Sequence, residues 1–333
     1  MISSGLLCSS FLPVRSSSSS PSVLCTRFGR KGFEDSSNRW CSSWPHHQLR
    51  KEVHVACGAQ KDAEQQQQQK QQLLEEGVQQ RRGQQIVLWA AESAYVLWLF
   101  LLPYAPGDPV WAIKPDTIDA LLGLSLNFFF ILPFANSVGI HVIESPVLHP
   151  VSEGLFNFVI GWTLMFAPLI YTDCKRDRYR GSLDLLWGLQ MFLTNIFLIP
   201  YMAIRLNDDD SNYAPRKLSK LGSIMTSGAP IVGLIGGAVC LLSAWWAFSG
   251  RGNYGFGSLE DRWEFFSRYI GSERLAYAFI WDICLYAVFQ PWLIGDNLQN
   301  VQESKVGIVS TLRYIPVVGL VAYLLSLNYD REL

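Results

Sequence analysis

The sequence predicts an all-α protein, a polytopic integral membrane helix bundle of seven (alternatively six) proline-kinked transmembrane helices behind a disordered N-terminal region. The composition is 49% hydrophobic and only 17% charged, and the apolar residues are unevenly placed. The first 85 residues are polar, whereas the rest contains nearly all of the long apolar runs. Runs of about 18 or more apolar residues are typical of helices that cross a bilayer. Each predicted helix also contains a proline, which kinks or ends a helix.

Residues 1–56 have the composition of a chloroplast transit peptide. The segment is rich in serine, carries several arginines and contains no acidic residue before Glu34. An Arg- and Ser-rich, acid-poor beginning is typical of organellar import. The sequence "VHVAC" at 53–57 resembles a stromal processing site, with the cut next to Ala56. The alternatives are mitochondrial import and a disordered N-terminus of a protein that stays elsewhere.

Residues 57–85 follow as a glutamine-rich, charged segment with too few apolar residues to bury a face. We expect a stromal tether here, either a solvated helix or a disordered or fraying chain. The membrane domain then covers 86–333.

Seven apolar segments in that domain are long enough to be predicted spans. They are 86–104, 117–142, 153–171, 183–205, 224–248, 275–295 and 309–327. Hydropathy favours all seven, whereas the distribution of Lys and Arg between loops favours six, with 86–104 dipping in and returning. Gly233 and Gly237 in the fifth segment predict a close contact with another helix.

The candidate functional residues are polar groups inside these spans. Asp282, Tyr286 and Gln290 are four residues apart, so they form one stripe on a helix. A carboxylate in the membrane is costly, so we expect Asp282 to face the bundle interior and to have a partner. That partner is expected to be Tyr323, another hydroxyl or its own proton, whereas Arg313 is expected to meet Gln290 or to reach the interface. Weaker candidates are Glu92, Asn127, His141, Glu144, Asn195 and Asp296.

Several chemistries are excluded by the sequence. Beyond the predicted transit peptide only His141 and His149 remain, too few for the histidine cluster of a membrane di-iron enzyme. The membrane domain contains no HExxH, GxSxG, GxxxxGK[ST] or GxGxxG motif. A formal net charge of −1 gives no nucleic-acid footprint. We therefore expect no catalytic residue, metal or cofactor, and membrane lipids as the principal partner.

Three segments resemble an uncharacterised family of polytopic membrane proteins found in cyanobacteria and chloroplasts. They are "GWTLMFAPLIYTD", "FLIPYMAIR" and "DICLYAVFQPWLIGDN". The last is similar to a D-x-C-L-x(4)-F-x-P-x-L-[LI]-G-D-[DN] helix end, with Phe289 and Pro291 one residue early. The resemblance implies a membrane of the photosynthetic lineage, thylakoid or inner envelope, and brings no activity or cofactor.

Three functions are compatible with these features. The first is a non-enzymatic factor that assembles or maintains a photosynthetic membrane complex. The second is a transporter or channel that uses Asp282, Gln290 and Arg313. The third is an enzyme acting on a lipid, a pigment or a quinone.

Overall fold

The computed structural model describes residues 47–193, 195–207 and 217–328, with side chains from residue 66 onward. Most of the predicted transit peptide, residues 1–46, lies outside this part of the chain. Two units are distinguished, 1–65 and 66–333, and all the features below belong to the second. Within the described residues the fold is helical, with one isolated antiparallel bridge between Val301 and Leu327. The predicted all-α class is therefore confirmed.

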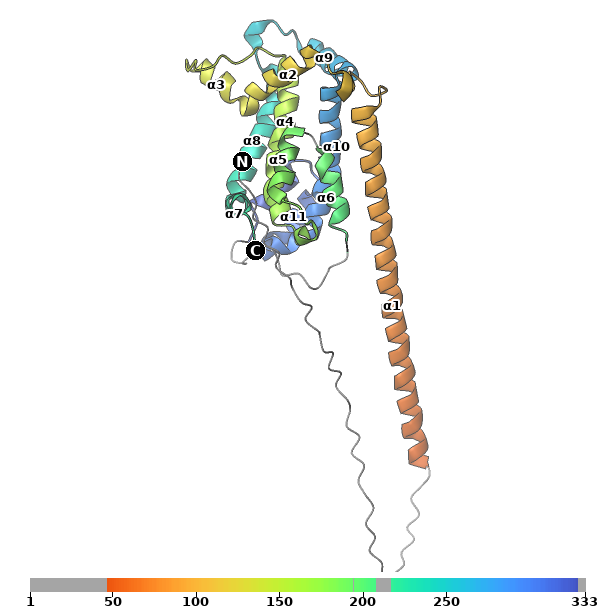
Figure 1. The fold of residues 1–333 in the computed structure, drawn as a ribbon. Helices are drawn as coiled ribbons and strands as arrows, with labels where there is room; N and C mark the ends of the chain where they lie inside the picture. Colours follow the sequence, from red (N-terminus) through yellow and green to blue (C-terminus); the bar gives the residue numbers. More distant parts are fainter. Residues whose placement is uncertain (1–46, 194, 208–216, 329–333) are drawn as a thin grey trace, which may run out of the picture. The chain divides into compact units, whose positions relative to one another are not determined.

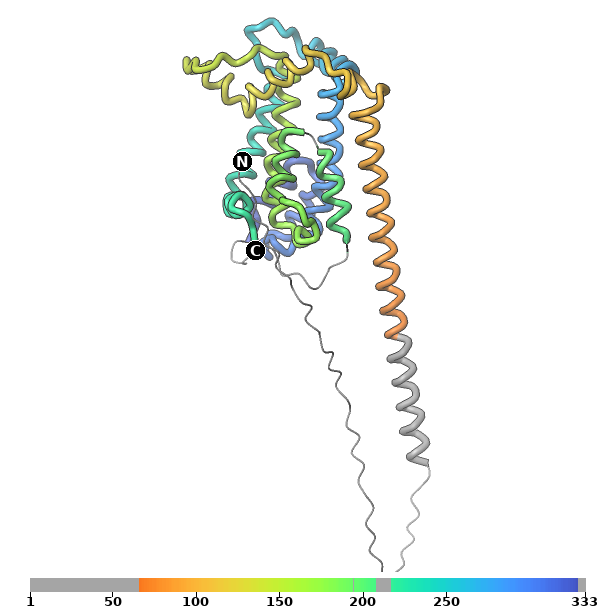
Figure 2. The backbone as a smooth tube through the Cα atoms, viewed as in Figure 1, coloured from red at the N-terminus to blue at the C-terminus, as the bar shows by residue number. Residues whose placement is uncertain are grey.

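The elements follow one another along the chain as shown in Figures 1 and 2. The α-helices are α1 (His47–Val96), α2 (Pro115–Leu126), α3 (Ile131–Ser137), α4 (Pro150–Tyr171), α5 (Leu183–Leu193), α6 (Leu198–Ile204), α7 (Lys220–Ser227), α8 (Ala229–Ser249), α9 (Leu259–Ser272), α10 (Arg274–Asp296), α11 (Val306–Leu312) and α12 (Val318–Leu324). The short turns are the π-helix η1 (Leu97–Leu101) and the 3-10 helices η2 (Val110–Ala112), η3 (Phe128–Phe130), η4 (Arg176–Arg178), η5 (Asn195–Phe197), η6 (Gly252–Tyr254), η7 (Leu298–Asn300) and η8 (Glu303–Lys305).

The Gln-rich segment is helical rather than disordered. Residues 57–85 all belong to α1, and the side chains from Gln66 to Gln85 are largely exposed. Gln and Glu are good helix formers, and a helix without an apolar face stays solvated. The predicted solvated helix is therefore observed, and the alternative of a disordered tether is corrected.

Five segments of the described chain are long and apolar enough to cross a membrane, fewer than the seven predicted. They are Gln66–Leu101, Pro115–Ser137, Pro150–Tyr171, Ala229–Tyr254 and Arg274–Asp296. The contacts of each segment show which of them pass from one end of the bundle to the other. We call the end beside Tyr171 and Asp296 the base and the end beside Pro150 and Arg274 the top.

The first segment passes from base to top along α10. At the base, Gln85 donates hydrogen bonds to Ala203 O and to Asn207 Oδ1. Halfway, the Tyr95 hydroxyl donates to Asp282. At the top, Arg274 donates to five backbone carbonyls of the chain between Leu99 and Gly107. The predicted span 86–104 is thus a complete crossing, and the alternative in which it returns is not seen.

The second segment stays at the top. Asn127, in its middle, donates to Glu153 in the first turn of α4, and Asn157 accepts a hydrogen bond from Phe129 N–H. Phe129 and Phe130 have φ of 53° and 57°, which breaks the helix there. Figure 1 shows α2 and α3 beyond the beginning of α4 rather than beside its length. The predicted span 117–142 therefore lies along one end of the bundle, although Pro115–Ser137 is long and apolar enough to cross a membrane.

The fourth predicted span, 183–205, is a hairpin that enters and leaves at the base. We call 183–204 the first hairpin. At its entrance, the hydroxyl of Tyr171, the last residue of α4, donates to Asp184 at 2.7 Å. At its exit, Arg205 binds Asp173, which lies only two residues after Tyr171. Between them, α5 rises along α4, where Trp187 Nε1 donates to Thr163 O. The chain then turns at Asn195 and descends through α6.

The last predicted span, 309–327, is also interrupted, and we call 306–324 the second hairpin. Its two ends are paired at the base, where Gln302 N–H donates to Ser326 O and Asn328 N–H donates to Asn300 O. Between α11 and α12 the chain turns at 313–317, and Val317 takes φ of 63°. In the described chain, complete crossings are therefore made by α1 with η1, α4, α8 and α10, and two hairpins reach in from the base.

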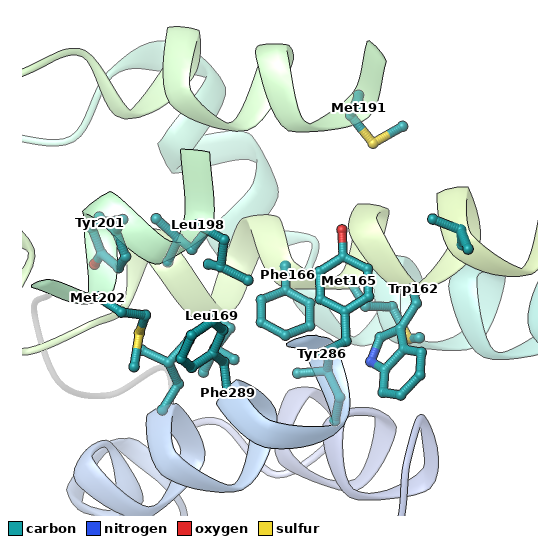
Figure 3. Close-up of a cluster of buried hydrophobic side chains, with 14 of the residues drawn as sticks. Trp162, Met165, Phe166, Leu169, Met191, Leu198, Tyr201, Met202, Tyr286 and Phe289 are labelled. Carbon is teal, nitrogen blue, oxygen red and sulfur yellow. The ribbon is translucent and has the colours of Figure 1, made fainter. Parts of the chain in front are cut away.

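The core is formed where α4 meets the hairpins and α10. Figure 3 shows Trp162, Phe166 and Leu169 of α4 packed among Leu198 and Met202 of α6 and Tyr286 and Phe289 of α10. All of these side chains are buried. The helices α4 and α8 approach closely because glycine faces the partner backbone, and a Cβ on Gly161 would lie 3.2 Å from Gly236 O. The predicted Gly233 and Gly237 pair faces α12, where Cβ atoms would meet Leu324 and Val321.

Candidate functional site

The predicted polar stripe on α10 lies in the bundle interior. Asp282, Tyr286 and Gln290 are 1%, 0% and 1% exposed. Each reaches a different neighbour, and two of the three hold the turn of a hairpin. We therefore describe the stripe from the residue nearest the top to the residue nearest the base.

Asp282 holds the turn of the first hairpin. Its carboxyl Oδ1 accepts the backbone N–H of Asn195 at 3.0 Å and the hydroxyl of Tyr95 at 3.4 Å. A helix break leaves backbone donors without partners, and a carboxylate is the strongest acceptor for them. The expectation of a hydroxyl partner on another helix is met by Tyr95. Tyr323 is not that partner, because its hydroxyl lies 3.1 Å from Thr172 Oγ1.

Asp282 is surrounded by further polar groups. The Asn195 side chain lies beside its carboxyl and beside the hydroxyl of Tyr286. One turn before the break, Gln190 is 3% exposed, and neither side-chain polar atom has a hydrogen-bond partner among the described residues. On α1, Glu92 lies one turn from Tyr95 on the same face, and its Oε2 is buried with no partner in the described chain. These groups form the least satisfied polar region of the core.

Gln290 holds the turn of the second hairpin with a complete set of hydrogen bonds. Its side-chain nitrogen donates to Arg313 O at 3.0 Å and Ile315 O at 2.9 Å. Its Oε1 accepts from Val317 N–H at 3.2 Å and from Trp162 Nε1 at 3.0 Å. A β-branched residue with positive φ is strained, and these bonds offset that strain. Between the two turns, the Tyr286 hydroxyl pairs with Thr163 Oγ1 on α4.

Arg313 meets Gln290 through its backbone carbonyl rather than through its charge. The guanidinium carbon lies 4.7 Å from the ring of Tyr314, whose hydroxyl accepts from Nη2. The side chain therefore does not line a path with Asp282. Three of the weaker candidates also lie away from Asp282. His141 and Glu144 are exposed at the top, and Asn127 pairs with the buried Glu153.

An ion-pair cluster at the base was missed by the sequence analysis. Arg205 is fully buried and donates two hydrogen bonds to Asp173, at 2.8 Å and 2.7 Å, and one to Asp296 at 2.9 Å. Asp173 also accepts from the Tyr201 hydroxyl and from Asn297 Nδ2. Lys175 completes the cluster with a 2.8 Å contact to Asp296. The cluster closes the exit of the first hairpin on the ends of α4 and α10.

The charge state of the cluster follows from its geometry. Burial alone would raise the pKa of Asp173, but the hydrogen bonds and the charge of Arg205 hold that pKa below its ordinary value of 3.8. Asp173 is therefore a carboxylate at neutral pH. The sequence did carry a signal for this cluster, because Asp173, Arg205 and Asp296 with Asn297 each stand at the end of an apolar run, in "LIYTD", "YMAIR" and "WLIGDN".

A second buried ion pair is found at the top. Glu153 is 0% exposed, and its two oxygens accept four hydrogen bonds, including two from Arg251 at 2.7 Å and 2.8 Å and one from Trp246 Nε1 at 2.8 Å. Asn127 donates to the same carboxylate. These bonds join the start of α4, the end of α8 and the break between α2 and α3. We interpret this cluster as structural, because its donors and acceptor are matched.

Comparison of the chain with family models, with characterised proteins and with solved structures finds no significant match to any of the three. The functional interpretation therefore depends on the geometry above.

Proposed function

We propose that this chain is a multi-pass protein of a chloroplast membrane that conducts protons, alone or coupled to a solute, through a site centred on Asp282. The observation that carries the proposal is the set of buried polar groups without protein partners at the turn of the first hairpin. The side chains of Gln190 and Asn195, on the two sides of the break, leave their polar atoms unpaired among the described residues, and Glu92, on α1 one turn from Tyr95, leaves Oε2 unpaired. Unpaired polar groups inside a membrane are costly, and they are typical of positions that water, a proton or an ion occupies.

The position of the site supports the same proposal. Asp282 is eight residues into α10, about 12 Å from the top end of the helix at 1.5 Å per residue. In transporters, interrupted helices place backbone groups at the binding site near the middle of the bilayer. Here the interrupted helix offers the N–H of Asn195 to a carboxylate. Protonation of Asp282 would weaken this bond, because hydrogen bonds to a charged acceptor are about twice as strong as those between neutral groups. Proton binding and release at Asp282 would therefore change the strength of the hydrogen bond that holds the turn of the first hairpin.

Charge distribution supports an orientation with the base toward the stroma. Among the described residues near the two ends, ten basic side chains lie at the base and five at the top. Those at the base are Arg81, Arg82, Lys175, Arg176, Arg178, Arg180, Arg205, Lys217, Lys220 and Lys305; those at the top are Lys114, Arg251, Arg262, Arg268 and Arg274. Positive loops favour the compartment from which insertion occurs. The transit-peptide composition and the resemblance to plastid proteins support a chloroplast membrane, thylakoid or inner envelope.

Proton flux in proteoliposomes tests the proposal. The full chain, reconstituted with a pH-sensitive dye inside the vesicles, is expected to pass protons when a potassium diffusion potential is applied. Asp282→Asn keeps the shape of the side chain and removes its titration, so flux should fall to that of protein-free vesicles. Asp119→Asn changes an exposed acid on α2 and should conduct like the wild type. Wild-type vesicles that behave like empty ones, or an Asp282→Asn variant that conducts normally, would contradict the proposal.

A second candidate is the non-enzymatic assembly or maintenance factor, and one observation favours it. From Gln66 to Gln85 the exposed part of α1 continues without interruption into a membrane-crossing helix. A solvated helix rigidly joined to a crossing helix is suited to contact a partner outside the membrane. The charged loops 173–180 and 250–274 are at opposite ends of the bundle, so only the first is at the same end as Gln85. Co-migration with a photosynthetic complex on native gels would support this candidate, and migration as a lone small species would oppose it.

A further inference from the structure

A nearly apolar cavity of about 210 Å³ lies at the top of the bundle, away from the Asp282 site. It is enclosed by α4, α8, α9 and α10, with Gly154, Leu155 and Phe158 on one side and Ala244 and Ala247 on the other. For scale, a cavity of about 150 Å³ lined by Leu, Ile and Phe is large enough to bind benzene. This cavity therefore accommodates a substituted six-membered ring.

Two polar residues line this cavity, Ser243 and Arg262, and only the Ser243 side chain lacks a hydrogen-bond partner among the described residues. Ser243, on α8, is 0% exposed and lines the cavity, and its hydroxyl has no hydrogen-bond partner in the part of the chain that the structure describes. A serine in a membrane helix usually returns its hydroxyl to a backbone carbonyl of the preceding turn, as Ser249 does with Trp245 O. An unpaired hydroxyl that is completely buried is costly, and a ligand acceptor in the cavity would satisfy it.

The roof of the cavity is fixed in place. Arg262 on α9 is 5% exposed, and it donates to Ala247 O and Gly250 O at the end of α8. The ring of His149 stacks on Phe265 of the same helix at 3.5 Å. The mouth is formed by Phe248 and Trp263, which are 58% and 63% exposed. An apolar tail can therefore leave past these two rings into the surrounding lipid.

The depth of Ser243 restricts the ligand. α8 has 21 residues and is about 30 Å long, the thickness of the hydrocarbon core. Ser243 lies six residues before its end, so the hydroxyl is about 9 Å inside that core. The ester carbonyls of a glycerolipid stay at the boundary, and its acyl chains carry no acceptor at this depth. A ring carbonyl within an otherwise apolar molecule fits both the depth and the cavity size.

From these observations we infer that the cavity beneath α9 binds the ring of a lipophilic quinone or a similar ring ketone, with one carbonyl oxygen accepting the Ser243 hydroxyl. The other lining atoms supply apolar contact, and the tail passes Phe248 and Trp263. This site is separate from the Asp282 site, and none of the three variants used below touches a residue of the proton path.

Binding of a decyl-tailed benzoquinone to the full chain in detergent micelles, measured by equilibrium dialysis, tests the inference. Ser243→Ala should weaken binding about 2- to 10-fold, the value of one neutral hydrogen bond. Ala244→Phe fills the cavity and should abolish binding, whereas Ser249→Ala, on the same helix and exposed, should not change it. Unchanged heat-unfolding midpoints identify the folded variants.

The inference is overturned if the quinone does not bind, or if it binds equally to the wild type, Ser243→Ala and Ala244→Phe. It is also overturned if native mass spectrometry finds a glycerolipid retained by the wild type and lost from Ala244→Phe while the quinone fails to displace it. Failure here leaves the flux measurement unaffected, because Asp282→Asn alters proton conduction and not the cavity.

Discussion

The two hairpins enter the bundle from the same end, but they are held by different chemistry. The first is fixed by carboxylates at both ends, Asp282 at its turn and Asp173 with Asp296 at its exit. The second is fixed by neutral amides, Gln290 at its turn and Asn300 at its base, where Asn300 donates to Thr172 O. Of the two hairpins, only the first is therefore held by groups that can take up a proton.

The two hairpin turns also differ in how completely their polar groups are hydrogen-bonded. The four hydrogen bonds of Gln290 satisfy the second turn, whereas at the first turn the side-chain amides of Gln190 and Asn195 are unpaired among the described residues. A satisfied polar network gives rigidity, and an incompletely satisfied one indicates a ligand or movement. The comparison favours a structural role for the second hairpin and supports the proposal that the proton site lies at the first.

The largest expected effect is on the exit of the first hairpin. Arg205→Met removes the cation from two carboxylates, and the buried Asp173 is left without its partner. Removal of one partner of a buried pair costs about 3–5 kcal/mol, so the heat-unfolding midpoint should fall sharply. Arg268→Met breaks an exposed i, i+4 pair with Glu264 and should cost less than about 1 kcal/mol. Equal losses in the two variants would show that the cluster at the base does not hold the hairpin.

The next effect concerns the turn of the second hairpin. Gln290→Leu keeps the volume and leaves the Arg313 carbonyl, the Val317 N–H and the Trp162 Nε1–H unpaired, whereas Ile315 O keeps its bond from Gly319 N–H. Each unpaired buried group costs about 1–3 kcal/mol, so the free energy of unfolding should fall by about 2–4 kcal/mol. Gln84→Leu, at an exposed position of α1, is the matched control. A stable Gln290→Leu variant would remove the distinction between the two turns.

A substitution at the turn of the first hairpin should change the free energy of unfolding much less than Gln290→Leu does. Asp282→Asn keeps an acceptor for the Asn195 N–H and removes a charge from the membrane interior. We expect a change of less than about 1 kcal/mol in unfolding free energy, because the lost charge-assisted bond is offset by the lower cost of burial. Unfolding in detergent, compared directly with Gln290→Leu, measures this. A loss as large as that of Gln290→Leu would indicate a structural role for Asp282.

The smallest effect is a local response to acid. The pKa of Asp173 in the folded protein lies below its ordinary value of 3.8, so the carboxylate stabilises the native state above that value. This stabilisation is lost as the pH falls through the lowered pKa. Hydrogen exchange, corrected for intrinsic rates, should therefore increase at 173–182 in strong acid and stay constant at 300–305. A parallel increase in both segments would contradict the chemical difference between the hairpins.

The sequence predicted the local features of this fold and failed on its long-range ones. The four-residue spacing of Asp282, Tyr286 and Gln290 was sufficient to place them on one buried face, because helix periodicity is local. Hydropathy could not separate a hairpin from a span, since 183–205 and 309–327 have the length and apolar content of a crossing helix. The reversal at each turn depends on a residue that is distant in sequence, because Asp282 is 87 residues from Asn195 and Gln290 is 27 residues from Val317.

The ion pairs were missed for the same physical reason. Arg205 and Asp173 are 32 residues apart, and Arg205 and Asp296 are 91 apart. A charge at the end of an apolar run is equally compatible with a solvated interface residue. Only the reversal of the first hairpin returns Arg205 to the end of α4, so the cluster could not be found before the hairpin was known.

Side-specific thiol labelling tests the hairpin architecture most directly. In vesicles of one orientation, and in a chain otherwise free of cysteine, the exposed native Cys174 precedes the first hairpin and a Lys217→Cys variant follows it. We predict that a membrane-impermeant maleimide labels both from the same side, and labels an Asn253→Cys variant at the top only from the opposite side. Labelling of Cys174 and of the Lys217→Cys variant from opposite sides would make 183–205 a crossing helix and would contradict the account.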